Sequence, residues 1–215
     1  EGLPDANTMP TWYFDLCNKA AGSPLTGVAE NTFDAFFPHG ITATTREGVL
    51  SRLPIAGIRL GHAEVTRYLI PNQLHTEETE AMPNRMDQRE GRQTTNVERL
   101  GRAAEALQEA LVQSVPRAPG EAPVIYVFPA WPRQWDANFE LLCRGDFLVS
   151  ASMLHGAVST VQITAQAGGT CRLANPWPGG SAVIYKNGKR WQSSSAKLLV
   201  FPTNTEDVFH ILPGK

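Results

Sequence analysis

Apolar residues recur at steps of three and four along residues 97–114, which predicts one long amphipathic helix. The apolar stripe consists of Val97, Leu100, Ala104, Leu107 and Leu111. Thr95 and Glu98 form the pattern T-x-x-E, which is typical of a capping box at a helix start. Pro116 cannot continue a helix, so we expect the element to end before it.

Shorter helical patterns come earlier, at about residues 46–57 and 61–70, and Pro71 is expected to end the second. Residues 71–96 are almost wholly polar. A loop of this length in a compact domain is usually functional or disordered.

Beyond residue 119 the pattern changes to short stretches rich in Val, Thr and aromatic residues that alternate with period two, which predicts strands. Two dipeptides predict hairpin turns, His155-Gly156 and, more strongly, Asn187-Gly188. The glycine-rich segment at 167–171 is expected to be a turn or bulge. The predicted strands cover residues 123–128, 138–143, 147–153, 157–164, 182–186, 189–192, 198–201 and 207–212.

These patterns together predict an α+β chain with two domains. Residues 1–118 form the helical part and residues 119–215 form an antiparallel β-sandwich. The boundary is expected in residues 115–123, where three prolines and a glycine interrupt any element.

Composition narrows the classes of function. The 215 residues are 42% hydrophobic and 19% charged, which is ordinary globular usage and argues against extensive disorder. A net charge of -2 provides no surplus for a phosphate backbone, so we expect no nucleic-acid partner. No apolar run approaches the roughly 20 residues of a membrane span, and the first residues lack a signal-peptide pattern. The chain is expected to be a mature product or a piece of a longer protein.

Common signatures of catalysis and of metal binding are absent from the sequence. It contains no G-x-S-x-G elbow, no P-loop and no H-E-x-x-H motif. The three cysteines lack zinc-site spacing and are expected to be buried free thiols, and the five histidines are scattered. We therefore predict no cofactor and no metal.

The richest polar cluster is the loop at 83–98, whose amides and charges suit sugar hydroxyls and the positioning of a general base. The other interpretation is a solvated loop that leads into a capped helix. Both place the Glu98 carboxylate at the helix start, where the macrodipole favours its charged form. Tryptophans 131 and 135 could stack on sugar rings, but their proline-bracketed spacing favours a rigid structural strut.

Five motifs in order resemble the C-terminal part of glycoside hydrolase family 95, which contains α-L-fucosidases and α-L-galactosidases. The motifs are ALQEALVQS, VFPAWPRQWD, LLCRGDFLVSASM, AGGTCRLANPW and YKNGK. The resemblance is good over residues 97–215, looser over 48–96, and absent over 1–47. It implies that the helical part belongs to an α/α barrel of six helix pairs, and it favours a secreted or periplasmic location.

The resemblance also implies inverting hydrolysis, in which an acid protonates the leaving oxygen and a base activates water on the opposite face. The family's base aspartate, in a D-G-N-F-G motif, corresponds to Glu98, although the local sequence here departs from that motif. The residues expected near the substrate are Asn84, Arg85, Gln93 and Asn96. The acid has no clear counterpart, and Glu30, set among aromatic and apolar neighbours whose burial would raise its pKa, is the candidate.

The predicted function is therefore the C-terminal portion of an inverting glycoside hydrolase for α-linked L-fucose-like or L-galactose-like sugars, inactive as an isolated chain. Twelve helices of about 11–12 residues need more chain than residues 1–118 provide, so the expected partners are a glycan and the remainder of the barrel or a partner chain. The alternative is a non-catalytic module for carbohydrate binding or assembly.

Overall fold

The predicted long helix is present as α5 (Val97–Leu111) in the computed structural model, which describes residues 4–22, 24–47, 51–74 and 97–214. Its end differs from the prediction, because Val112–Val115 leave the helix and form strand β1. Pairing with β2 (Val124–Val127) overrides the helical pattern at this point, and the two β-branched valines are well suited to a strand. The buried face also differs: Ala104 is exposed, and Ala103, Ala106 and Ala110 are buried instead.

Six shorter elements precede α5 in the described part of the chain. Helices α1 (Pro4–Trp12) and α2 (Leu25–Asp34), with the 3-10 turn η1 (Lys19–Ala21) between them, lie in a part of the chain for which the sequence predicted no helix. Helix α3 (Leu53–Leu60) occupies the end of the stretch predicted at 46–57 and continues beyond it.

Pro71 does not end the helix in which it lies, contrary to the prediction. The π-helical turn η2 (Val65–Leu69) runs directly into α4 (Ile70–Leu74), and Pro71 lies inside α4. Within the π turn the Ile70 amide donates to the Val65 carbonyl, five residues back. This wider turn is a known way for a helix to accommodate an irregularity such as the missing amide and bulky ring of a proline.

Helix α3 is the centre of the helical region, and every one of its residues is buried. Gly57 makes the closest approach, because a Cβ atom there would lie 2.6 Å from Phe33 Cζ and 2.7 Å from Val65 Cγ2. Helices α2 and η2 therefore pack against α3 at a position where only glycine fits.

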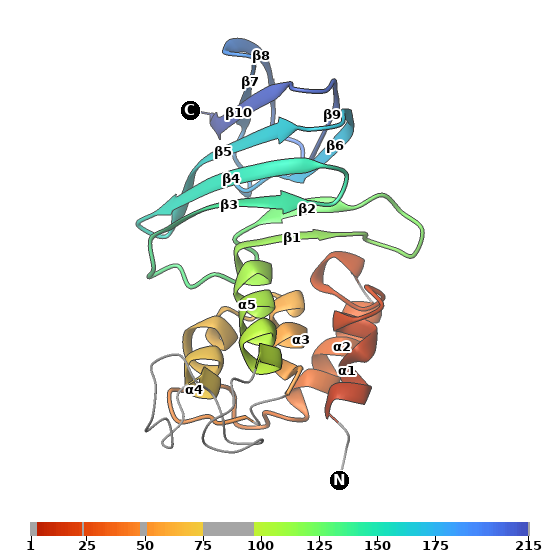
Figure 1. The fold of residues 1–215 in the computed structure, drawn as a ribbon, viewed down its shortest axis with the longest axis vertical. Coiled ribbons are helices and arrows are strands. Elements are labelled where there is room, and N and C mark those ends of the chain that lie inside the picture. The colour runs from red at the N-terminus through yellow and green to blue at the C-terminus, as the bar shows by residue number, and fades with distance from the viewer. Residues whose placement is uncertain (1–3, 23, 48–50, 75–96, 215) are drawn as a thin grey trace. The chain divides into compact units, whose positions relative to one another are not determined.

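The β region contains two sheets (Figure 1). One has the order β1-β2-β6-β9, with β6 (Gly169–Ala174) and β9 (Leu198–Thr203). All of its pairs are antiparallel except β2 with β6. The sequence missed β6, because its first residues belong to the segment expected to be a turn.

The second sheet has the order β3-β4-β5-β10-β7-β8 and is antiparallel throughout. The last strand of the chain is inserted between β5 and β7, which no local pattern predicts. The strands are β3 (Ala137–Cys143), β4 (Phe147–Leu154), β5 (Ala157–Ala165), β7 (Ala182–Lys186), β8 (Lys189–Ser194) and β10 (Val208–Pro213).

Both sheets contribute to one hydrophobic core, in which Phe201 of β9 and Phe209 of β10 lie with ring centroids 4.7 Å apart. Cys143 and Cys171 are buried in this core and form no disulfide, as predicted, whereas Cys17, which also forms no disulfide, is only half-buried. Burial raises the pKa of Cys171 to about 12, so its thiol stays protonated at neutral pH.

Both predicted hairpin turns are confirmed. His155 and Gly156 have φ values of 51° and 77°, and Asn187 and Gly188 have 50° and 79°. Positive φ at both central residues matches the right-handed twist of the strands that flank a two-residue turn.

The chain divides into two compact units, Glu1–Ala110 and Leu111–Lys215. The predicted α+β class is confirmed: helices come first and two largely antiparallel sheets follow. An α/α barrel is not shown by the helices of the described residues. The described residues also contain no helix with the length and apolar character needed to cross a bilayer.

Candidate functional site

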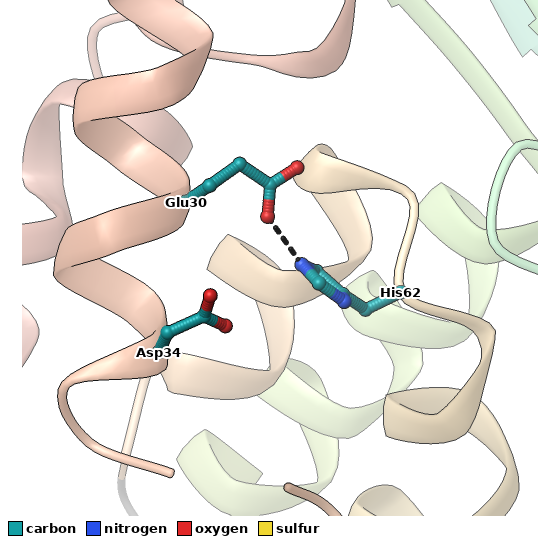
Figure 2. A group of neighbouring side chains, drawn as sticks. All are labelled: Glu30, Asp34 and His62. Carbon is teal, nitrogen blue, oxygen red and sulfur yellow. Dashed lines mark hydrogen bonds and ion pairs between the residues drawn. The ribbon is translucent and has the colours of Figure 1, made fainter. Parts of the chain in front are cut away.

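The helical unit brings together two carboxylates from one face of α2. Glu30 and Asp34 are four residues apart, so they lie one turn above the other on the helix. Figure 2 shows both side chains projecting from α2 toward the imidazole of His62. Glu30 is half-buried and Asp34 is exposed, so the group is open to solvent at one side.

His62 reaches this position because α3 ends just before it. Gly61 caps α3 in the left-handed conformation, with φ of 89°, which turns the chain away from the helix axis. The His62 ring then stacks on Phe33 of α2, with ring centroids 4.9 Å apart and an interplanar angle of 24°. Because Phe33 is itself buried, this contact holds the ring in a defined plane.

Each nitrogen of the His62 ring faces a carboxylate. Nε2 lies 2.7 Å from Oε2 of Glu30, and Nδ1 lies 2.9 Å from Oε1 of Glu64. The hydrogen bond that Glu64 accepts raises the pKa of His62 above its ordinary value, Glu30 acts in the same direction, and burial opposes both. The same hydrogen bond lowers the pKa of Glu64. The site therefore favours a positive charge between these carboxylates.

The donor atoms of Glu30, Asp34 and His62 all lie within 4.8 Å of one another. One imidazole nitrogen and two carboxylates are a donor set that several divalent metals accept. Lys19 is mostly exposed, and its Nζ is 3.8 Å from Oε1 of Glu30. Neither the spacing of the histidines nor any sequence motif indicates this group, because His62, in the turn after α3, is 28 or more residues from the two carboxylates of α2. The only local signal was the pair of carboxylates four residues apart.

A second ionic cluster lies deeper in the helical unit. The guanidinium of Arg59, which is buried in α3, forms ion pairs with Asp15 and with Glu109 of α5. Its Nη2 lies 2.8 Å from Oε1 of Glu109. Burial raises the pKa of Glu109, and the neighbouring arginine partly offsets that effect. This cluster joins the loop after α1, α3 and α5, and the sequence did not single it out.

The predicted hydrolytic residues fall largely outside the described residues. Four of them lie wholly outside: Asn84, Arg85, Gln93 and Asn96. The backbone of Glu98 belongs to the first turn of α5, but its side chain is not among the described ones. Glu30 is described, but its surroundings are not the apolar ones expected. It faces His62 and Lys19, while Phe33 packs on the histidine.

Trp131 and Trp135, expected to act as a structural strut or to stack on sugar rings, contact each other in the β unit, and Trp177 is also held there. Trp131 Nε1 donates to the carbonyl of Trp135, and the two rings meet edge to face at 71°. Trp177 Nε1 donates to the carbonyl of Val158. Trp131 and Trp177 also pack against the β core. Both side chains therefore have a structural role in the β unit.

Comparison with known proteins gives little further information. No protein-family model and no curated protein matches the sequence. A solved structure described as a glycoside hydrolase is similar, with 9% sequence identity and a TM-score of 0.34. The match covers 81% of this chain and 34% of that chain, so this chain spans about a third of its length. Likeness at this level does not establish a shared fold, and membership of family 95 stays a prediction.

Proposed function

We propose that the chain is the C-terminal portion of an inverting glycoside hydrolase similar to family 95, acting on α-linked L-fucose-like or L-galactose-like sugars. The observation that carries the proposal is the placement of the five motifs. They fall in chain order on the end of α5 with β1, the connection from β2 to β3, the β3–β4 hairpin, β6 and the β7–β8 hairpin. The motifs therefore extend from the end of α5 over strands of both sheets and the turns between them.

In this proposal Glu98 supplies the general base from the start of α5. The free amides and the dipole at a helix N-terminus favour an ionised carboxylate, which is the form a base needs. Asn84, Arg85, Gln93 and Asn96 would contact the sugar, and Glu30 is the candidate acid. Asp34 is not the partner of Glu30 in an inverting pair, since their oxygens lie within 4.8 Å and inverting enzymes separate the two carboxyls by roughly 6.5–9.5 Å.

We also propose that the helical unit is part of an α/α barrel completed by more chain or by a partner. Five large apolar side chains of this unit are more than a third exposed. Monomeric proteins rarely leave large apolar patches uncovered, so these side chains are suited to packing against further helices. They are Tyr13, Phe14, Leu16, Leu25 and Val28.

The test is hydrolysis of aryl α-L-fucosides and α-L-galactosides by this chain and by versions extended upstream. We expect little or no turnover by the 215-residue chain and clear turnover, with inversion followed by NMR, once the barrel is complete. E98Q should then lower kcat at least about 100-fold, because a general base contributes that much or more. E105Q, on an exposed position of the same helix, is the matched control. Cleavage of none of these glycosides by the extended protein would refute the proposal.

The alternative function is a non-catalytic carbohydrate-binding or assembly module. The observation in its favour is Trp135, which is 37% exposed in the β unit and could stack on a sugar. Its edge-to-face contact with Trp131 provides no flat platform of two rings. Binding of fucosylated oligosaccharides without cleavage, lost in W135A, would favour this module over the hydrolase.

A further inference from the structure

We propose that Glu30, Asp34 and His62 bind a divalent transition-metal ion of the zinc class, and while the ion is bound Glu30 does not act as the acid of the proposed hydrolase. The three side chains converge from α2 and from the turn after α3 (Figure 2). They provide one nitrogen and carboxylate oxygens from two residues, within 4.8 Å of one another.

The separations are close to those that an ion requires. Ligands about 2.0–2.1 Å from a tetrahedral zinc ion lie about 3.3 Å from each other. The contact between His62 Nε2 and Glu30 Oε2, at 2.7 Å, therefore needs to open by a few tenths of an ångström, and the proton shared between the two atoms is released to solvent as the ion takes its place. Asp34 needs to move inward, and its exposed side chain forms no hydrogen bond or ion pair with another described residue. Small side-chain rotations are enough to complete the set.

The histidine is already oriented as a ligand. Glu64 accepts at Nδ1, which leaves Nε2 directed at Glu30, and stacking on Phe33 fixes the plane of the ring. A carboxylate on the far nitrogen is the usual support for a metal-bound histidine, because it fixes the tautomer and makes the ligating nitrogen more basic. Glu64 is therefore a positioning residue in the proposal.

Charge and donor type favour a transition metal. Three carboxylates, those of Glu30, Asp34 and Glu64, surround His62. Among the described lysines, Lys19 forms an ion pair with Glu30, at 3.8 Å. An exposed pair of that length contributes at most about 1 kcal/mol, so the lysine is readily displaced. Imidazole together with carboxylate suits zinc, cobalt or nickel, whereas magnesium and calcium prefer oxygen ligands alone. A bound ion would join α2 to the turn between α3 and η2.

Titration of the whole 215-residue chain with Zn²⁺ by calorimetry tests the proposal. The C17S background removes the half-exposed thiol as a competing ligand. We expect one ion per chain, at least a tenfold loss of affinity in D34N, a 10- to 100-fold loss in E64Q, and no binding at this site in H62Q. H210Q and E140Q, which change exposed residues of the β unit, are the matched controls and should bind as the parent does.

Two further measurements keep the result unambiguous. The unfolding temperature of metal-free D34N should equal that of the parent, so that lost binding is not lost folding. The Co²⁺ complex should show ligand-field bands without a thiolate charge-transfer band. The proposal is overturned if D34N and the parent bind Zn²⁺ equally, if the Co²⁺ spectrum shows sulfur ligation, or if Ca²⁺ and Mg²⁺ bind as tightly as Zn²⁺. None of these outcomes depends on glycoside hydrolysis.

Discussion

Arg59 shows how a single residue stabilises the helical unit. Its side chain is 7% exposed and balances two carboxylates, Asp15 and Glu109, that come from other segments. A buried ion pair adds little stability in comparison with apolar residues, but the loss of one partner leaves an uncompensated charge. The contribution of Arg59 therefore lies chiefly in neutralising Glu109, whose pKa burial raises.

We expect R59M to destabilise the helical unit by about 3–5 kcal/mol, since it removes the buried guanidinium that pairs with Asp15 and Glu109. Chemical denaturation followed by circular dichroism at 222 nm measures this loss. The double variant R59M/E109Q should recover much of it, and R67M, at an exposed arginine of η2, should change stability by less than about 1 kcal/mol. A loss in R59M no larger than in R67M would contradict this account of the cluster.

At the scale of elements, α2 and η2 can pack closely on α3 because Gly57 of α3 has no side chain. Phe33 of α2 and Val65 of η2 occupy the space that a Cβ atom would need. Phe33 also stacks on His62, so the packing of α2 on α3 determines where the candidate metal ligands meet. The same residue type has no such role at Gly101 of α5, where a Cβ atom would meet nothing within 4 Å.

G57A and G101A should therefore have opposite effects. Alanine at Gly101 should stabilise the helical unit by up to about 1 kcal/mol through helix propensity alone. Alanine at Gly57 gains the same propensity but overpacks a buried contact, which costs about 1–3 kcal/mol, and a gap of 2.6 Å to the buried Phe33 ring favours the upper part of that range. Denaturation midpoints of the two variants provide the comparison, and stabilisation by G57A would show that α2 can retreat freely.

In the β unit, Asp207 ties one turn to another. Its carboxylate accepts from Lys186 at 2.7 Å, from the Asn204 amide at 2.7 Å and from the Asn187 side chain at 2.9 Å. Asn187 in turn accepts from the Val208 amide at 2.9 Å, so the β7–β8 hairpin is fastened to β10. The hydrogen bond from Lys186, followed by those from Asn204 and Asn187, lowers the pKa of Asp207 to about 2.

Because of this lowered pKa, the stability of the β unit decreases at acidic pH. An aspartate in the unfolded chain titrates at about pH 4. The ionised Asp207 therefore stabilises the folded β unit above that pH, and this stabilisation is lost as the pH falls toward 2. We expect the unfolding temperature of the β unit to fall across this window, and D207N to have a lower unfolding temperature at pH 7 and a shallower fall. E206Q, at the exposed neighbouring residue, should retain the parent's pH profile. An identical acid dependence in D207N and the parent would contradict this interpretation.

At the scale of the whole molecule, the chain consists of two compact units, and each buried network described above lies within one of them. Distant sites without shared partners change stability additively. The helical unit and the β unit are therefore expected to respond separately to substitutions.

Scanning calorimetry of R59M, D207N and the double variant tests this independence. R59M should lower the transition of the helical unit, D207N should lower that of the β unit, and the double variant should show the sum of both within about 0.5 kcal/mol. Hydrogen exchange assigns each transition to its unit. A single transition that both substitutions shift equally would show that the two units unfold together.

The β region was predictable because its signals are local. Alternating stretches predicted eight of the strands at or near their observed positions, and Asn187-Gly188 specified its own turn through positive φ. Strand β1 was missed because Val112–Val115 continue an apparent helical stripe, and only pairing with β2 turns them into a strand. The prediction that Pro71 ends its helix was wrong, because the π turn η2 runs directly into α4, which contains this proline.

The candidate site illustrates the limit of local patterns. Glu30 and His62 are 32 residues apart, and Arg59 and Glu109 are 50 apart, so no spacing rule connects either pair. Turns and alternating strands follow from backbone preferences and side-chain order, which the sequence alone determined for this protein. Which charged groups face one another depends on how helices pack, and here the close approach at Gly57 and the cap at Gly61 decided it. Only the tertiary structure contains that information, because packing joins residues that are distant along the chain.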